Sequence, residues 1–117
     1  MVDVSGELQK IKQETSVGKR TQCAEQLAGS IKSKGQQSVS DADIDSLASM
    51  MSDRDDSVRY WIATALGYVG PRAHHAIPQL EQALRERACD NSSKTSASAI
   101  RLAMSRIGVK VPEFPCN

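Results

Sequence analysis

Apolar residues fall in helical groups that repeat every thirty-odd residues along this chain, and this period constrains its fold more than any other feature. The starts of the first helices match at shifts of 33 and 36 residues: Leu8/Ile11, Ile44/Leu47 and Ile77/Leu80. The ends of the second helices match at shifts of 35 and 38: Ile31–Gly35, Leu66–Gly70 and Met104–Gly108. A helix-pair period of this length is typical of a solenoid, in which each unit is stable only when it is stacked on its neighbour.

The apolar spacing is helical throughout, and no stretch alternates with the period of two that a strand requires. It predicts six helices, at about residues 4–14, 18–33, 40–51, 56–69, 76–89 and 93–107. Ser40 and Asp43 form a capping box at the start of the third helix. Gly35 suits the left-handed end of the second helix, and Pro78 fits only the first turn of the fifth. The fold class expected is therefore all-α.

The helices group into three pairs within one domain of 117 residues, which is long enough to bury a modest core. The pairs cover about residues 4–35, 40–70 and 76–108. Pro112 and Pro115 make the tail, residues 109–117, extended.

The composition is that of an ordinary globular chain, with 39% apolar and 25% charged residues. The net charge is +1, but residues 1–35 carry +2, residues 36–70 carry −4 and residues 71–117 carry +3. The acidic middle interrupts the basic residues of the second helices (Lys19, Arg20, Arg59, Arg101 and Arg106), so nucleic acid is not an expected partner. No apolar run has the length of a membrane span. No leader peptide is visible, and the start MVDVSG leaves open whether one was removed.

The stretch Asp53–Gly70, DRDDSVRYWIATALGYVG, resembles the second helix of a HEAT repeat, with D-x-D-x-x-V-R followed by an A-x-x-A-L-G-like run. The following GPRAHHAIPQLEQAL resembles the link into the next unit. The similarity is good over residues 41–88 and weaker over 1–35 and 89–108. It implies a short right-handed α-α superhelix of about three HEAT-like pairs. It also implies that Asp53 and Arg59 form a structural ladder between repeats.

Residues that could carry catalysis or bind a metal are few. His74 and His75 are adjacent, so on a helix their side chains point about 100° apart and do not readily share one ion. The acids of Ser52–Ser57 lack the glycine and the closing glutamate of a calcium loop. No enzyme activity, cofactor or metal is expected, and helix-dipole chemistry accounts for the acids more simply.

Binding of another protein is the function expected of a short solenoid. Val58, Ile62, Leu66 and Val69 form the core stripe of the fourth helix, so Tyr60, Thr64 and Tyr68 lie on other faces. Together with Arg101 these three residues form a possible binding ridge, since Tyr and Arg are enriched at interface hot spots. Trp61 is expected to pack against a neighbouring repeat. The loops Asp53–Ser57 and Asn91–Lys94 are further candidates, with Asp55, Asp56, Ser93 and Lys94 as contacts.

The three cysteines are expected to differ in role. Cys23 lies on the apolar stripe of the second helix and is expected to be a buried free thiol. An extended tail can run back along the sixth helix and bring Cys116 near Cys89, so a disulfide between them is predicted. That bond would imply a periplasmic or secreted protein. Two unpaired thiols in the cytoplasm are the alternative.

The most specific function predicted is that of a bacterial immunity protein, which binds and inhibits a cognate toxin enzyme. A HEAT-repeat scaffold or adaptor subunit without an inhibitory role is the alternative, and a helper similar to the HEAT-repeat bilin lyases is a distant one. Weak to moderate homodimerisation is also expected, because a short stack of repeats has two open ends.

Overall fold

The computed structural model describes residues 2–87, 89 and 95–114. These residues are helical with extended connections, and no strand occurs among them. The α-helices are α1 (Val4–Gln13), α2 (Val17–Lys34), α3 (Asp41–Ser49), α4 (Asp56–Val69), α5 (Ile77–Glu86) and α6 (Ser96–Ile107). Short 3-10 turns follow three of them: η1 (Gln36–Ser38), η2 (Met50–Ser52) and η3 (Gly70–Ala76). The predicted all-α class is confirmed.

Local signals in the sequence end the helices close to where they were expected. The capping box is present, with the Asp43 amide donating to Ser40 Oγ and the Ser40 amide donating to the Asp43 carboxylate. Pro78 lies in the first turn of α5. Gly35 ends α2 with a φ of 89°, a region that favours glycine. α5 ends at Glu86, before the predicted residue 89, and α6 begins at Ser96, after the predicted residue 93.

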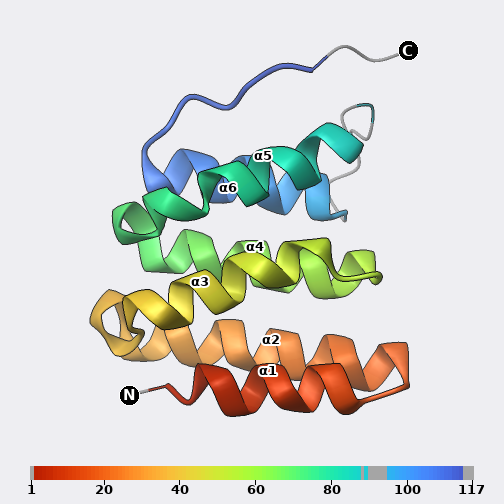
Figure 1. Cartoon of the computed structure of the whole chain (residues 1–117). Coiled ribbons are helices and arrows are strands. Elements are labelled where there is room, and N and C mark those ends of the chain that lie inside the picture. The colour runs from red at the N-terminus through yellow and green to blue at the C-terminus, as the bar shows by residue number, and fades with distance from the viewer. Residues whose placement is uncertain (1, 88, 90–94, 115–117) are drawn as a thin grey trace.

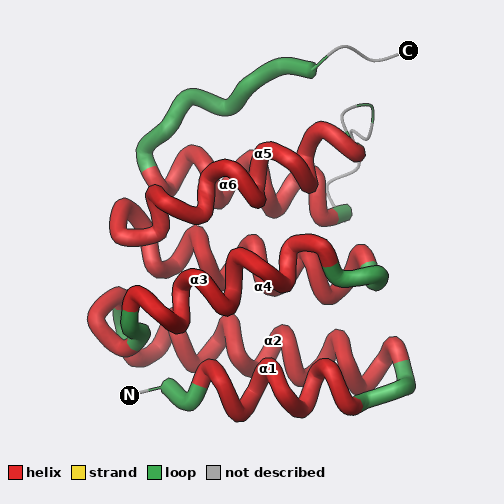
Figure 2. The backbone as a smooth tube through the Cα atoms, in the orientation of Figure 1, coloured by secondary structure: helices red, strands yellow, loops and turns green. Residues whose placement is uncertain are grey.

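The helices form three antiparallel pairs stacked on one another (Figure 1). α1, α3 and α5 make one row, and α2, α4 and α6 make the row behind it. Figure 2 shows the short connections at the two edges of the stack. Since every second helix runs in the same direction, the beginnings of α2, α4 and α6 share one edge and their ends share the other.

The core lies between the two rows and matches the predicted apolar stripes. The fully buried large side chains include Ile11, Leu27, Ile31, Ile44, Leu47, Ile62, Leu66, Leu80, Leu84, Ile100 and Met104. Cys23 is only half-buried, which corrects the expectation of a buried thiol. Four residues turn an α-helix by about 400°, so a spacing of four drifts by about 40° per step. Cys23 therefore lies about 80° around α2 from Ile31, at the edge of the stripe.

α4 and α6 approach each other closely at Gly67. A Cβ atom built on Gly67 would lie 3.1 Å from the Cα of Ala103 and 3.4 Å from Cδ of Arg106. The missing side chain thus permits both the helix contact and the passage of the Arg106 side chain across α4. Because Ala103 faces α4 here, this contact also fixes the rotation of α6.

The described part of the tail packs on the last helix pair, as the sequence predicts. Val109, Val111 and Phe114 are partly buried against the core. The Arg85 guanidinium lies 4.6 Å from the centroid of the Phe114 ring, which holds the tail beside α5.

Candidate partner-binding face

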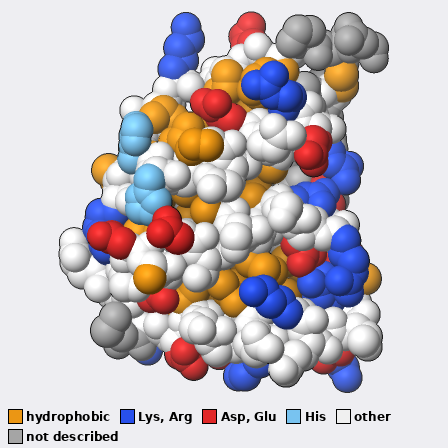
Figure 3. Space-filling view, viewed as in Figure 1, with side chains coloured by type: hydrophobic (Ala, Val, Ile, Leu, Met, Phe, Trp, Pro, Cys, Tyr) orange, Lys and Arg blue, Asp and Glu red, His pale blue; other side chains and the backbone are white. Residues whose placement is uncertain are grey.

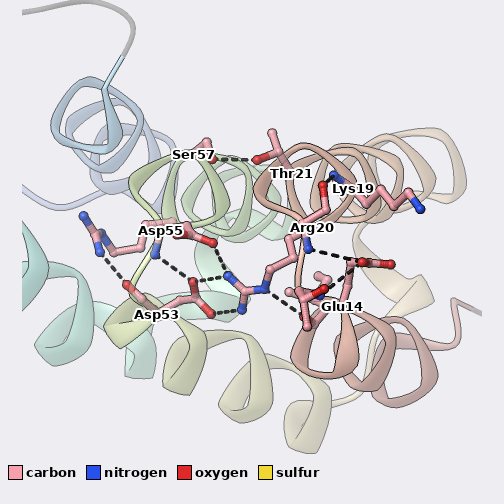
Figure 4. A network of polar contacts seen from close by, with 11 residues as sticks. Glu14, Lys19, Arg20, Thr21, Asp53, Asp55 and Ser57 are labelled. Atoms are coloured by element: carbon pink, nitrogen blue, oxygen red, sulfur yellow. Dashed lines mark hydrogen bonds and ion pairs between the residues drawn. The ribbon is translucent and has the colours of Figure 1, made fainter.

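Arg20 is the most unusual side chain in the molecule, because it is charged and only 1% exposed. Its Nε donates to the carbonyl of Ile11 at 3.0 Å, at the end of α1. Its two Nη atoms donate to the Asp53 carboxylate at 3.0 and 2.6 Å, and Nη1 also donates to Asp55. Figure 4 shows Arg20 reaching from α2 into the acidic loop before α4. One side chain therefore ties the first helix pair to the second.

The charges of this cluster stabilise one another. Hydrogen bonds to Asp53 raise the pKa of Arg20 above its ordinary value, although burial opposes this. Burial by itself would raise the pKa of Asp53. Hydrogen bonds from Arg20 and from the Asp55 backbone outweigh burial and lower the pKa of Asp53 below 3.8. Arg20 and Asp53 are therefore both ionised at neutral pH.

Asp56 makes the corresponding link between the second and third helix pairs. Its carboxylate accepts bonds from the Ser96 amide at 3.0 Å and from Ser96 Oγ at 2.5 Å, at the start of α6. It also accepts from Arg59 Nη2 at 3.0 Å. Burial alone would raise the pKa of Asp56, but the bonds from Ser96 and Arg59 lower it. A residue of α4 thus supplies the cap that the first turn of α6 needs.

The ladder expected between Asp53 and Arg59 has a different geometry. Arg59 donates to the backbone carbonyl of Asp53 and to the Asp56 carboxylate, both within its own repeat. The Asp53 carboxylate instead forms an ion pair with Arg20 of the preceding helix pair. Arg20 precedes Asp53 by 33 residues and Asp55 by 35, which is the repeat period. This spacing is the signal in the sequence that could have identified the contact, but a basic residue next to Lys19 also fits a surface position.

Asp55 and Asp56, predicted as partner contacts, form ion pairs and hydrogen bonds within the chain. Asp55 pairs with Arg20, and its side chain is 16% exposed. Asp56 accepts hydrogen bonds from Ser96 of α6 and pairs with Arg59, and its side chain is 27% exposed. Their role in partner binding stays a prediction, and it requires the partner to bind groups already engaged within the chain.

The predicted ridge residues of α4, Tyr60, Thr64 and Tyr68, are half-buried, and so is Trp61, which was expected to pack on a neighbouring repeat. We name these four residues the aromatic stripe. The Tyr60 and Trp61 rings meet edge to face at 5.0 Å. Thr64 bonds the Tyr60 carbonyl, and the three aromatic rings pack partly against the core. The rings are therefore anchored against the core and partly accessible to solvent.

The basic group beside Tyr68 is Arg106, which the sequence-based ridge did not include. Its Cζ lies 5.1 Å from the Tyr68 ring centroid, and Lys32 Nζ of α2 lies 5.5 Å from the same centroid. Arg101 lies elsewhere on α6. It is two residues from Ala103, which faces α4, and two residues turn a helix by about 200°. Helical geometry thus places Arg101 on a different side of α6 from the contact with α4, and its part in the ridge stays a prediction.

Several predicted residues fall outside the described part of the chain. These are Ser93 and Lys94, with the loop Asn91–Lys94, and Cys116 of the predicted disulfide with Cys89. Their roles stay predictions. Cys23 is unpaired.

The opposite face, formed by α1, α3 and α5, mixes acidic and basic side chains (Figure 3). His75 lies there and pairs with Asp45 at 2.9 Å. A groove of about 360 Å³ runs between α3–η2 and α5, with Arg59 in its lining. Within residues 2–87, 89 and 95–114, no three His, Cys, Asp or Glu side chains group to hold a metal ion. None of the helices in those ranges combines the length and apolar character needed to cross a bilayer.

Comparison of the chain with protein-family models, with curated proteins and with solved structures finds no match.

Proposed function

We propose that this chain is a short HEAT-like solenoid, a right-handed α-α superhelix of three helix pairs, whose function is to bind another protein. The observation that carries the proposal is the aromatic stripe at the centre of the α2/α4/α6 face. Tyr and Trp are the residues that most often anchor protein interfaces, because they bury a large area at a low cost in side-chain entropy. The stacked helix pairs and the Arg20–Asp53 contact, whose spacing of 33 residues matches the helix-pair period, support the solenoid part of the proposal.

The rigidity of this face favours tight binding. Arg20 fixes α2 against the loop that begins α4, and Asp56 fixes α4 against the start of α6. Thr21 Oγ1 and Ser57 Oγ add a bond of 2.6 Å between α2 and α4. A surface that is already ordered loses little entropy when a partner docks on it. The three helices of the face therefore present their side chains as one preformed unit.

The narrower role is that of an immunity protein, in which the aromatic stripe covers the active site of a toxin enzyme. A preformed, rigid face suits this task, since inhibitors that bind enzymes tightly move little on binding. An oxidising compartment such as the periplasm belongs to the same proposal and depends on the predicted disulfide. The scaffold alternative differs only in what the bound partner does.

Binding through the aromatic stripe can be tested once the wild-type protein has captured its partner from the native host. We expect Tyr60→Ala/Tyr68→Ala to weaken the measured Kd by about 10- to 100-fold, because two anchors are lost. Tyr60→Phe/Tyr68→Phe keeps the rings and should stay close to wild type. Gln9→Ala/Gln82→Ala on the opposite face is the matched control. Thermal unfolding checks that each variant is folded.

Equal Kd values for the wild type and the double alanine variant would overturn the proposal for this face. If the captured partner is an enzyme, its activity decides the narrower role. Loss of activity on adding one equivalent of this chain supports an immunity protein. Full activity in the complex leaves the scaffold alternative.

A further inference from the structure

Tyr68 lies between two cations that come from distant parts of the sequence. Lys32 Nζ of α2 is 5.5 Å from the Tyr68 ring centroid, and Arg106 Cζ of α6 is 5.1 Å from it. We name these three residues the basic aromatic cluster. Arg106 reaches Tyr68 because Gly67 has no side chain in its path. A cation from the basic first part of the chain and a cation from its basic last part thus lie beside the same ring, which belongs to the acidic middle part.

The charges of the basic aromatic cluster are not neutralised within the described chain. Lys32 and Arg106 are exposed, and neither forms an ion pair with a described acidic residue. α6 contains no acidic residue, and the one acid of α2 is Glu25. Glu25 precedes Lys32 by seven residues, which is about 10 Å along the helix axis. The cluster is therefore a local basic site at one end of the face.

Resting on the proposed function, we infer that the partner protein presents an acidic segment, Asp or Glu, to the basic aromatic cluster. A carboxylate near Tyr68 would contact both cations. The neighbouring Tyr60 and Trp61 would contact an apolar or aromatic residue on the same segment. Electrostatic complementarity of this kind sets the orientation of a partner and speeds its association.

A nucleic acid is a poorer fit to the same charges. Binding a phosphate backbone requires a continuous basic track, and affinity grows with the number of phosphates neutralised. On this face Lys32 and Arg106 lie beside Tyr68, whereas Arg20 and Arg59 are already paired with the carboxylates of Asp53, Asp55 and Asp56. A short acidic peptide segment can bind a basic site of this size, whereas a long phosphate backbone requires a continuous row of unpaired cations.

Two matched peptides test the inference by titration into isotope-labelled protein, followed by NMR. The probes are acetyl-Trp-Glu-Glu-Glu-amide and its uncharged counterpart acetyl-Trp-Gln-Gln-Gln-amide. We expect the Glu peptide to bind about three- to tenfold more tightly at low salt, since two exposed ion pairs contribute. Its shifts should centre on Lys32, Tyr68 and Arg106, and the preference should shrink as salt screens the charges.

Charge variants separate this site from a general attraction. Lys32→Gln/Arg106→Gln should abolish the preference for the Glu peptide. Lys12→Gln/Lys19→Gln removes the same charge from other exposed positions and should keep the preference. Equal binding of both peptides at the aromatic stripe would overturn the inference while leaving the proposed function intact.

Two further results would also overturn the inference. One is the absence of any shift at the cluster with either peptide, and the other is tighter binding of a short oligothymidylate to the same amides. In both cases the Tyr60→Ala/Tyr68→Ala measurement with the native partner still decides the proposed function independently.

Discussion

Arg20 and Arg59 both contact the loop before α4, yet they differ in burial and in the number of chain segments they join. Arg20 is 1% exposed and connects the end of α1 to two carboxylates before α4, in the next helix pair. Arg59 has a side chain that is 11% exposed, and its contacts with Asp53 and Asp56 stay within its own helix pair. Loss of a buried partner leaves the remaining charges unpaired in a medium that solvates them poorly.

We therefore expect Arg20→Ala to lower the free energy of unfolding by about 3–5 kcal/mol. Arg59→Ala should lower it by about 1–3 kcal/mol, because its remaining acid keeps the bonds from Ser96. Urea denaturation measures both changes, and Arg54→Ala at an exposed position is the control. An equal cost for Arg20→Ala and Arg59→Ala would contradict the assignment of Arg20 as the main link between repeats.

The carboxylates of Asp53 and Asp56 predict how stability changes with acid. Their pKa values are lower in the folded protein than the ordinary 3.8, so the unfolded state binds protons first as the pH falls. The stabilisation is complete well above 3.8 and is lost as the pH drops through the lower folded values.

We expect the free energy of unfolding to fall steadily below about pH 4, as measured by urea denaturation at a series of pH values. Asp56→Asn should reduce this dependence, whereas Glu25→Gln, which lies outside both networks, should preserve it. A profile for Asp56→Asn that runs parallel to that of wild type would show that Asp56 does not contribute to the acid response.

At the level of elements, the contact between α4 and α6 depends on one small residue. A Cβ at Gly67 would lie 3.1 Å from the Cα of Ala103, a backbone atom that cannot move aside alone. Gly29 is also in a helix, but a Cβ there meets nothing within 4 Å. The two glycines thus form a matched pair.

We expect Gly67→Ala to destabilise the protein by about 1–3 kcal/mol, as overpacking does in a tight contact. Gly29→Ala should stabilise it by up to about 1 kcal/mol, because alanine is the better helix former. Thermal unfolding of the two variants provides the comparison. A Gly67→Ala protein as stable as Gly29→Ala would mean that α6 can shift away from α4 without cost.

At the level of the whole molecule, the tail closes the last helix pair. The Arg85 guanidinium lies 4.6 Å from the centroid of the Phe114 ring. Phe114 is two residues before Cys116 in the sequence, and Arg85 is four residues before Cys89. Cys116 lies outside the described residues, so the disulfide with Cys89 stays a prediction. Closure of a loop of about 28 residues would stabilise the protein by about 3–4 kcal/mol in the chain-entropy model.

Mass spectrometry of alkylated, non-reduced protein tests the disulfide. We expect one label, on Cys23, and three labels after reduction. Three labels without reduction would contradict both the bond and the oxidising compartment inferred from it.

Homodimerisation was expected from the open ends of the stack and stays a prediction. The tail packs on the last pair, and the exposed large apolar side chains among the described residues are Val17 and Leu102. The first helix pair has no such cover among the described residues, so weak to moderate self-association stays the expectation. Light scattering that shows only monomer at high protein concentration would contradict it.

Features that depend on residues three or four positions apart were predictable from the sequence. The apolar stripes, the Ser40–Asp43 box and the early turn position of Pro78 involve contacts within one helix. Helical geometry alone therefore sets which side chains meet, and these predictions agree with the structure. The period of the stripes also indicated that the helices come in pairs.

The rotation of each helix about its axis decides which side chains meet across the helix pairs. The spacing of 33 and 35 residues between Arg20 and its two carboxylate partners matches the helix-pair period, but it does not by itself select these residues, and the position of Arg106 beside Tyr68 has no signal in the sequence. Such contacts depend on how far each helix is rotated about its own axis. Packing at positions such as Gly67 sets that rotation, and a turn of one residue moves a side chain by about 100°.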